Sequence, residues 1–159
     1  MAEKVLTDEM RQAIEAFIPR YPSKQAVTLP ALHIVYERLR CVPRDAIIEI
    51  AAILELHPSQ VQDTLSFYGY FPQDKPCGRT RVWVCRSISC ALRGADELLD
   101  QMAHKLGVKP GETTADERIT LEFAECLGAC EHAPCILANK ELHKSVTPEQ
   151  AETLLKNCQ

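Results

Sequence analysis

The chain has 159 residues, of which 46% are hydrophobic and 25% are charged, and its formal net charge is -4. A chain of this size and composition can bury a core of its own, and its nearly balanced charge argues against a nucleic-acid partner. Its longest apolar stretch, residues 46–54, is interrupted by Glu49 and is too short to cross a bilayer. We therefore expect a globular protein without a membrane-spanning segment.

The first part of the chain, from about residue 7 to residue 70, predicts three or four helices. Thr7 is placed as the N-cap of the first helix, and Pro19 ends that helix. Pro30 suits the first turn of a second helix, because a proline there removes no helical hydrogen bond. A third apolar stripe predicts another helix, and a shorter fourth one opens at Pro58.

An aromatic run, Phe67–Phe71, follows the helices, and we expect it to pack between the helical part and the rest of the chain. The polar, turn-rich residues 72–78 suit a linker. We place the domain boundary there, with an N-terminal helical region at 1–76 and a second domain at 77–159.

Beyond the boundary the pattern changes to that of an α/β domain with a small mixed sheet. The sequence predicts the following elements in chain order: strands at 80–84 and 119–124 with a helix at 91–106 between them, short strands at 135–138 and 142–144, and a final helix. Thr147-Pro148 begins that last helix with an N-cap, a proline at the first helical position and a capping box.

The role expected of the cysteines depends on whether the cellular compartment is reducing or oxidising. Residues 1–5 have neither the apolar centre of a secretory signal nor the Arg-rich character of a transit peptide, so we expect a cytosolic protein. In a reducing compartment, closely spaced cysteines more often bind metal or carry out redox chemistry than form disulfides. Cys41, Cys77 and Cys158 have no near cysteine neighbour, and we expect them to be buried thiols.

Two close cysteine pairs remain. Cys85 and Cys90 form a C-x4-C pair after the first strand, and Cys126 and Cys130 form a C-x3-C pair after the second. If the two strands are parallel neighbours, their loops meet at one edge of the sheet and bring four thiolates together. Four thiolates suit either zinc or an iron–sulfur cluster. The wide spacing favours a two-iron cluster, since zinc knuckles mostly use C-x2-C turns, and zinc stays an open alternative.

The surroundings of the pairs favour a negatively charged centre. A helix beginning near Ala91 is expected to point its first amides toward Cys85 and Cys90, and Gly94 and Gly128 allow close backbone approach. Arg86 and Arg93 either supply positive charge or are solvated surface residues. A disulfide oxidoreductase is disfavoured, because such enzymes use a C-x-x-C motif that this sequence lacks.

Six segments then match a known family in chain order: residues 21–24, 29–35, 67–68, 85–94, 125–130 and 133–134. Together they resemble the thioredoxin-like [2Fe-2S] ferredoxin subunit of NADH:quinone oxidoreductase, or respiratory complex I. The resemblance implies a helical part followed by a thioredoxin-like domain, with one [2Fe-2S] cluster held by Cys85 and Cys90 on one iron and by Cys126 and Cys130 on the other.

The resemblance also implies partners. The subunit would dock on a flavoprotein that oxidises NADH with FMN, would exchange single electrons with that flavin, and would lie with other peripheral-arm subunits on the inner face of the cell membrane. It would have no catalytic residue, NADH or FMN of its own, in agreement with the absence of a G-x-G-x-x-G turn.

Several positions depart from the family pattern. Relatives often have Gly where Arg40 stands and Gly-Asn where Glu131-His132 stands; the acid should lower the cluster's potential, and a protonatable His132 could make it depend on pH. Cys135 is a core residue, an alternative ligand or a redox-sensitive neighbour. Two other functions stay open: the equivalent subunit of a soluble NAD-linked hydrogenase or formate dehydrogenase, and a zinc-stapled interaction module.

Overall fold

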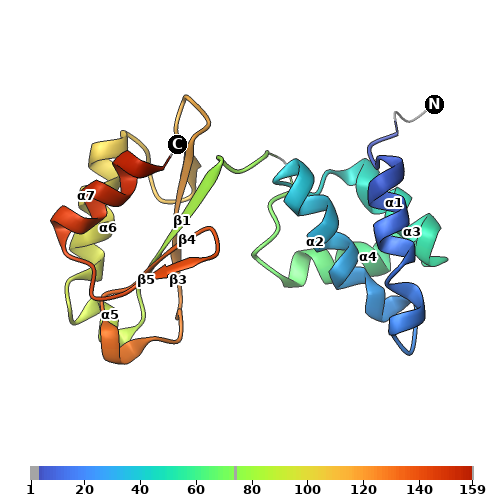
Figure 1. Ribbon diagram of the computed structural model, residues 1–159, viewed down its shortest axis with the longest axis horizontal. Coiled ribbons are helices and arrows are strands. Elements are labelled where there is room, and N and C mark those ends of the chain that lie inside the picture. Colours follow the sequence, from blue (N-terminus) through green and yellow to red (C-terminus); the bar gives the residue numbers. More distant parts are fainter. Residues whose placement is uncertain (1–3, 74, 159) are drawn as a thin grey trace. The chain divides into compact units, whose positions relative to one another are not determined.

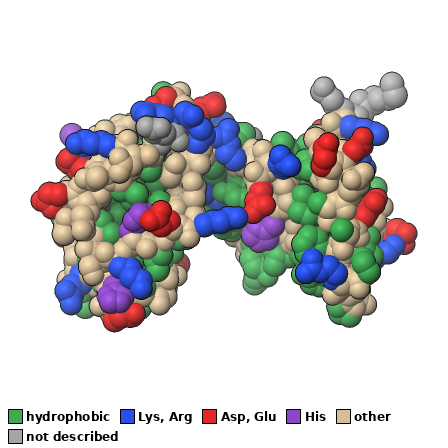
Figure 2. Space-filling model, in the orientation of Figure 1, with side chains coloured by type: hydrophobic (Ala, Val, Ile, Leu, Met, Phe, Trp, Pro, Cys, Tyr) green, Lys and Arg blue, Asp and Glu red, His purple; other side chains and the backbone are tan. Residues whose placement is uncertain are grey.

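The computed structural model describes residues 4–73 and 75–158, and the chain divides into two units, Met1–Pro76 and Cys77–Gln159. Helices form the first unit, and a sheet with helices forms the second (Figure 1). Residues 1–3, on which the targeting expectation partly rests, and Asp74 of the expected linker lie outside the described residues. Charged side chains of both signs are spread over both units on the face shown in Figure 2.

The described residues of the first unit form four α-helices, where the sequence predicts three or four. They are α1 (Asp8–Glu15), α2 (Thr28–Leu39), α3 (Arg44–Leu54) and α4 (Pro58–Phe67), with short 3-10 turns at Ile18–Arg20 and Gln25–Val27. Thr7 caps α1 as expected, because its hydroxyl accepts a hydrogen bond from the Met10 amide at 3.3 Å. The helices enclose one core, whose largest fully buried side chains are Ile14, Leu32, Val35, Ile50, Leu54 and Leu65. No helix among the described residues is long and apolar enough to cross a membrane.

Part of the aromatic run packs inside the helical unit. Phe71 is buried in the helical core, and Tyr70 packs against that core. The Phe71 ring lies 4.9 Å from the His33 ring, and the Tyr70 ring lies 4.9 Å from that of Tyr36. The segment that follows α4 is therefore packed against the helical unit through Tyr70 and Phe71.

The second unit is built on a mixed five-stranded sheet, which confirms the predicted α/β class. Its elements are β1 (Thr80–Cys85), α5 (Ile88–Ala91), α6 (Ala95–Leu106), β2 (Glu112–Thr113), β3 (Ile119–Ala124), a 3-10 turn η3 (Cys130–His132), β4 (Ile136–Ala138), β5 (Glu141–His143) and α7 (Pro148–Asn157). The strand order is β2-β3-β1-β4-β5; among the described strands β1 and β3 pair in parallel, and the other neighbouring pairs are antiparallel. Helices α6 and α7 pack together over one face of the sheet (Figure 1).

One predicted helix is wrong in its extent. The single helix expected at 91–106 is two helices, α5 and α6, separated at Gly94. Gly94 has a φ of 85°, a left-handed conformation that interrupts the helical hydrogen bonds and that side chains larger than hydrogen rarely adopt. The longer helix of this unit, α6, therefore begins at Ala95, and Cys90 lies in the short α5. The two-residue strand β2 is an addition that the sequence pattern does not indicate.

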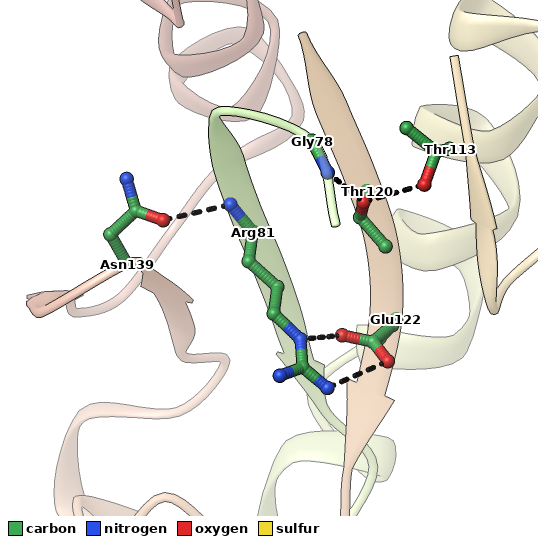
Figure 3. Close-up of polar contacts among 6 residues, drawn as sticks. All are labelled: Gly78, Arg81, Thr113, Thr120, Glu122 and Asn139. Carbon is green, nitrogen blue, oxygen red and sulfur yellow. Dashed lines mark hydrogen bonds and ion pairs between the residues drawn. The ribbon is translucent and has the colours of Figure 1, made fainter. Parts of the chain in front are cut away.

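The parallel pair at the centre of the sheet is held by side chains as well as by its ladder. The Arg81 guanidinium on β1 binds the Glu122 carboxylate on β3, and the Arg81 amide donates to Asn139 Oδ1 at 2.8 Å (Figure 3). Just before β1, the Gly78 amide donates to the Thr120 hydroxyl at 2.6 Å, and that hydroxyl lies 2.7 Å from the Thr113 hydroxyl. These contacts fix the register of β1 against β3.

Candidate metal centre

The two cysteine pairs follow the two parallel strands at the same end of the sheet. The register of β1 and β3 pairs Cys85 with Ala124, so the strands end level with each other. The Arg86 amide extends the ladder by donating to the Ala124 carbonyl at 2.9 Å. The loops that follow, with α5 and η3, contact each other at this end (Figure 1). The predicted meeting of the two loops is therefore present.

The first pair is buried. Cys85 ends β1 and Cys90 lies in α5, and each side chain is 2% exposed. Burial, followed by the hydrogen bond with the Cys85 side chain, raises the pKa of the Cys90 thiol to about 12. Cys85 Sγ lies 3.7 Å from the Glu125 carbonyl oxygen, on the loop that leads to the second pair. The two thiols are thus neighbours in an apolar environment.

The second pair is exposed. Cys126 lies on the loop after β3 and Cys130 opens η3. The hydrogen bond with the Cys126 side chain, and the charge that Cys126 would carry, raise the pKa of Cys130. The Gly128 amide donates a hydrogen bond to Cys126 Sγ at 3.4 Å.

Ser89 and Cys85 connect the two pairs. The Ser89 side chain, between the cysteines of the first pair, hydrogen-bonds the Cys130 side chain and opposes the rise of its pKa, and the charge of Cys85 also acts on Cys130. Sequence reasoning did not single out Ser89; its position inside the C-x4-C loop was the only signal. Among the described residues, no three His, Cys, Asp or Glu side chains converge on a point that would hold a single ion.

The remaining four cysteines are buried, as was predicted for Cys41, Cys77 and Cys158. Cys41, Cys77 and Cys158 are 6–7% exposed and lie outside the two loops. Cys135 is 0% exposed and lies just before β4, where it contacts both cysteine loops. Burial raises the pKa of its thiol.

The charged residues near the loops are engaged in surface contacts. Arg86 lies 3.4 Å from Asp96 and stacks 4.7 Å over the Phe123 ring, so part of its charge is already neutralised. Arg93 is exposed. His132 Nε2 lies 3.7 Å from Glu131 Oε1, and both side chains are exposed. The helix N-terminus expected near Ala91 lies at Ile88, where the short α5 begins, and the longer α6 begins at Ala95.

The donor set fits a two-iron cluster. Such a cluster takes two thiolates on each iron, and the side chains here interact as Cys85 with Cys90 and as Cys126 with Cys130. An amide donor to sulfur and a half-buried position are the means by which proteins stabilise such a centre. The residues present therefore suit a [2Fe-2S] cluster.

Comparisons with known proteins point to the same kind of centre. Residues 14–159 match the family model described as thioredoxin-like [2Fe-2S] ferredoxin. The chain is 35% identical over 148 residues to a subunit of the NADH-quinone oxidoreductase of Rhizobium meliloti, covering 93% of this chain and 88% of the relative. It is 36% identical over 152 residues to a subunit of the NADH-quinone oxidoreductase of Buchnera aphidicola, covering 96% and 93%.

A solved structure shares the fold. The air-oxidised NAD+-reducing [NiFe]-hydrogenase superimposes with a TM-score of 0.73 at 23% identity. The match covers 82% of this chain but only 22% of the hydrogenase chain, so this chain corresponds to about a fifth of that larger protein. At this level of identity the likeness shows the fold alone.

Proposed function

Because the chain belongs to the thioredoxin-like [2Fe-2S] ferredoxin family, we propose that it is the electron-transfer subunit of an NADH:quinone oxidoreductase. Family membership confirms the resemblance drawn from the sequence. The chain's part in the reaction is to take and release single electrons, while a separate flavoprotein subunit carries out the chemistry of NADH with FMN.

The observation that carries the proposal is the placement of two thiol pairs at the level ends of two parallel strands. Cys85 and Cys90 would hold one iron, and Cys126 and Cys130 the other. When bound, the cluster supplies one-electron redox chemistry. The chain sets the conditions for it: Cys85 and Cys90 are buried, and the Gly128 amide donates to the Cys126 sulfur.

Exposed apolar side chains beside the loops suit the docking of the partner. Ile88 is 78% exposed and Leu92 is 83% exposed, one helical turn apart around Cys90, and Phe123 is 45% exposed at the end of β3. Large apolar side chains gathered next to a functional loop mark interaction surfaces. We propose that these three residues contact the NADH-oxidising flavoprotein and bring the cluster close to its flavin.

The same proposal places the protein among the other peripheral-arm subunits, in the cytoplasm and attached to the inner face of the cell membrane through the complex. The alternative host, a soluble NAD-linked hydrogenase or formate dehydrogenase, uses the same one-electron chemistry. The subunits that copurify with the tagged chain from its own cells distinguish these hosts: proton-pumping membrane subunits support the first, and hydrogenase or molybdenum subunits support the second.

The cluster is tested on the full chain purified without oxygen. We expect two irons and two sulfides per chain. We also expect no EPR signal in the oxidised protein and an S = 1/2 signal after dithionite. A colourless protein that holds one zinc, and that still fails to take up iron and sulfide on reconstitution, would instead support the zinc-stapled interaction module.

Ligand identity is tested by serine substitution. Each of Cys85→Ser, Cys90→Ser, Cys126→Ser and Cys130→Ser should lose the cluster or change its spectrum, because a hydroxyl is a poor ligand for iron at this position. Cys158→Ser is the control, since Cys158 is a buried cysteine of the same unit that lies outside both loops. A cluster left unchanged by a substitution would remove that cysteine from the ligand set.

The docking surface is tested separately from the cluster. Ile88→Asp combined with Leu92→Asp should weaken capture of the flavoprotein at least tenfold while leaving the EPR signal intact. Gln101→Asp, on the exposed side of α6, is the control. Equal capture by both variants would contradict the proposed surface.

A further inference from the structure

Cys135 is a buried thiol outside the four proposed ligands, and it contacts both ligand loops. Its side chain is 0% exposed. Its backbone carbonyl accepts the Cys85 amide at 3.1 Å, at the end of β1. Its thiol lies 3.4 Å from the Ala129 carbonyl and 3.2 Å from the His132 carbonyl, on the second loop. One residue therefore joins the two loops through its backbone and its side chain.

The two carbonyl contacts of the Cys135 thiol flank one proposed ligand, Cys130, and the Cys135 side chain also hydrogen-bonds that of another, Cys90. Ala129 directly precedes Cys130, and His132 follows it by two residues, so the two carbonyls lie on either side of Cys130. The thiol has one hydrogen, which the two carbonyls share. His132 O also accepts the Ser145 amide at 2.7 Å, and Ala129 O accepts the His132 amide at 3.0 Å. The η3 turn is thus hydrogen-bonded by two residues: by the thiol of Cys135 in the core, and by the amide of Ser145 in the segment before α7.

We propose that Cys135 is a positioning residue, whose thiol holds the η3 turn so that Cys130 is directed toward the Cys85–Cys90 pair. This role rests on the proposed cluster site, but its structural part concerns the turn alone. A small apolar residue would fill the same space without a donor, so the hydrogen bond is what the thiol adds. Partners that orient a ligand in this way commonly change metal retention by ten- to a hundredfold when they are removed.

Two substitutions of nearly equal size separate the hydrogen bond from the volume. Cys135→Ser keeps a donor, and Cys135→Ala removes it, while both retain the backbone contact to Cys85. Cys158→Ser and Cys158→Ala form the matched control pair, because Cys158 is a buried thiol of the same core whose side chain lies beside Thr80 instead of a ligand loop.

The first measurement uses the full chain without its cluster. Hydrogen exchange of the His132 amide, and alkylation of Cys130, should both be roughly tenfold faster in Cys135→Ala than in the wild type, and close to wild type in Cys135→Ser. This result does not depend on a cluster, so it tests the positioning role even if the cluster proposal fails. Equal rates in the alanine and serine variants would overturn it, because volume alone would then explain both.

The second measurement uses the loaded protein. Loss of the cluster to an iron chelator should be roughly tenfold faster in Cys135→Ala and should return toward the wild-type rate in Cys135→Ser. The two Cys158 variants should lose the cluster at the wild-type rate. If Cys135→Ala retains its cluster as long as Cys135→Ser does, the thiol has no part in holding Cys130.

Discussion

The guanidinium of Arg81 on β1 binds both carboxylate oxygens of Glu122 on β3, with Nη2 and Oε1 3.0 Å apart (Figure 3). Arg81 is 3% exposed, and its guanidinium also stacks 4.3 Å over the Trp83 ring. These are the two strands whose ends carry the cysteine loops. The ion pair therefore helps to fix the relation between the loops, although it lies away from them.

Breaking this ion pair should destabilise the sheet. Glu122→Gln leaves a buried guanidinium without its counterion, and we expect the free energy of unfolding to fall by about 3 kcal/mol, as for other pairs of this kind. Trp83 is the only tryptophan in the chain and lies in β1, so its fluorescence during denaturant unfolding reports on this unit.

The replacement of both partners provides the control. The double variant Arg81→Met with Glu122→Met removes the two charges together. It should lower the free energy of unfolding clearly less than Glu122→Gln alone does, because no unpaired charge is left buried. A Glu122→Gln protein as stable as the wild type would show that the ion pair contributes little to the strand pairing.

A methyl group at Gly78 should separate the start of β1 from β3. A Cβ at Gly78 would lie 2.8 Å from the backbone N and C atoms of Ile119, and backbone atoms cannot move aside as a flexible side chain can. We expect Gly78→Ala to lower the free energy of unfolding of the sheet by about 1–3 kcal/mol, measured by Trp83 fluorescence.

Gly69→Ala, in the helical unit, is a control for the glycine-to-alanine change itself, because a Cβ at Gly69 would meet nothing within 4 Å. Gly69→Ala should leave the midpoint of unfolding within experimental error. A Gly78→Ala protein with an unchanged midpoint would mean that β1 can shift without cost to the sheet.

Arg40 occupies a position that favours glycine. It ends α2 with a φ of 59°, and this left-handed conformation costs a residue with a side chain about 1–2 kcal/mol. Arg40→Gly should therefore raise the stability of the helical unit by about 0.5–1 kcal/mol, followed by helical circular dichroism during thermal unfolding.

Arg38, two residues earlier inside α2, gives a control of opposite sign. Arg38→Gly should lower stability by about 1 kcal/mol, because glycine is a poor residue in a helix interior. If both glycine substitutions lower the free energy of unfolding equally, the left-handed conformation of Arg40 does not destabilise the helical unit.

The sequence predicted the elements and the thiol pairs but not the contacts between them. Hydrophobic periodicity and caps such as Thr7 locate helices well, because these signals are local. Periodicity does not detect a dihedral angle, so the break at Gly94 was missed. The partnership of Arg81 with Glu122 depends on the register of two strands that lie far apart in the chain. The direction of the Cys135 thiol depends on three loops at once, and no local pattern encodes it.

The thiols should make cluster binding depend on pH. In the cluster-free protein, burial and the Cys85 side chain raise the pKa of Cys90 to about 12, and the Cys126 side chain raises that of Cys130. Both thiols are therefore protonated at neutral pH, whereas iron binds the thiolate. Each must release a proton on binding, so cluster binding should strengthen as pH rises, by up to about tenfold per pH unit for each proton released.

The protons can be counted directly. Reconstitution at pH 7 to pH 9 in buffers of different ionisation enthalpy gives the number released, and Cys90→Ser should release about one fewer. The cluster-free protein should show the opposite trend in stability. The unfolded Cys90 ionises above its ordinary pKa of 9.0 while the buried one stays protonated, so the free energy of unfolding falls as pH rises from about 9 toward 12. A binding constant that stays the same between pH 7 and pH 9 would mean that these thiols are already ionised before the cluster binds.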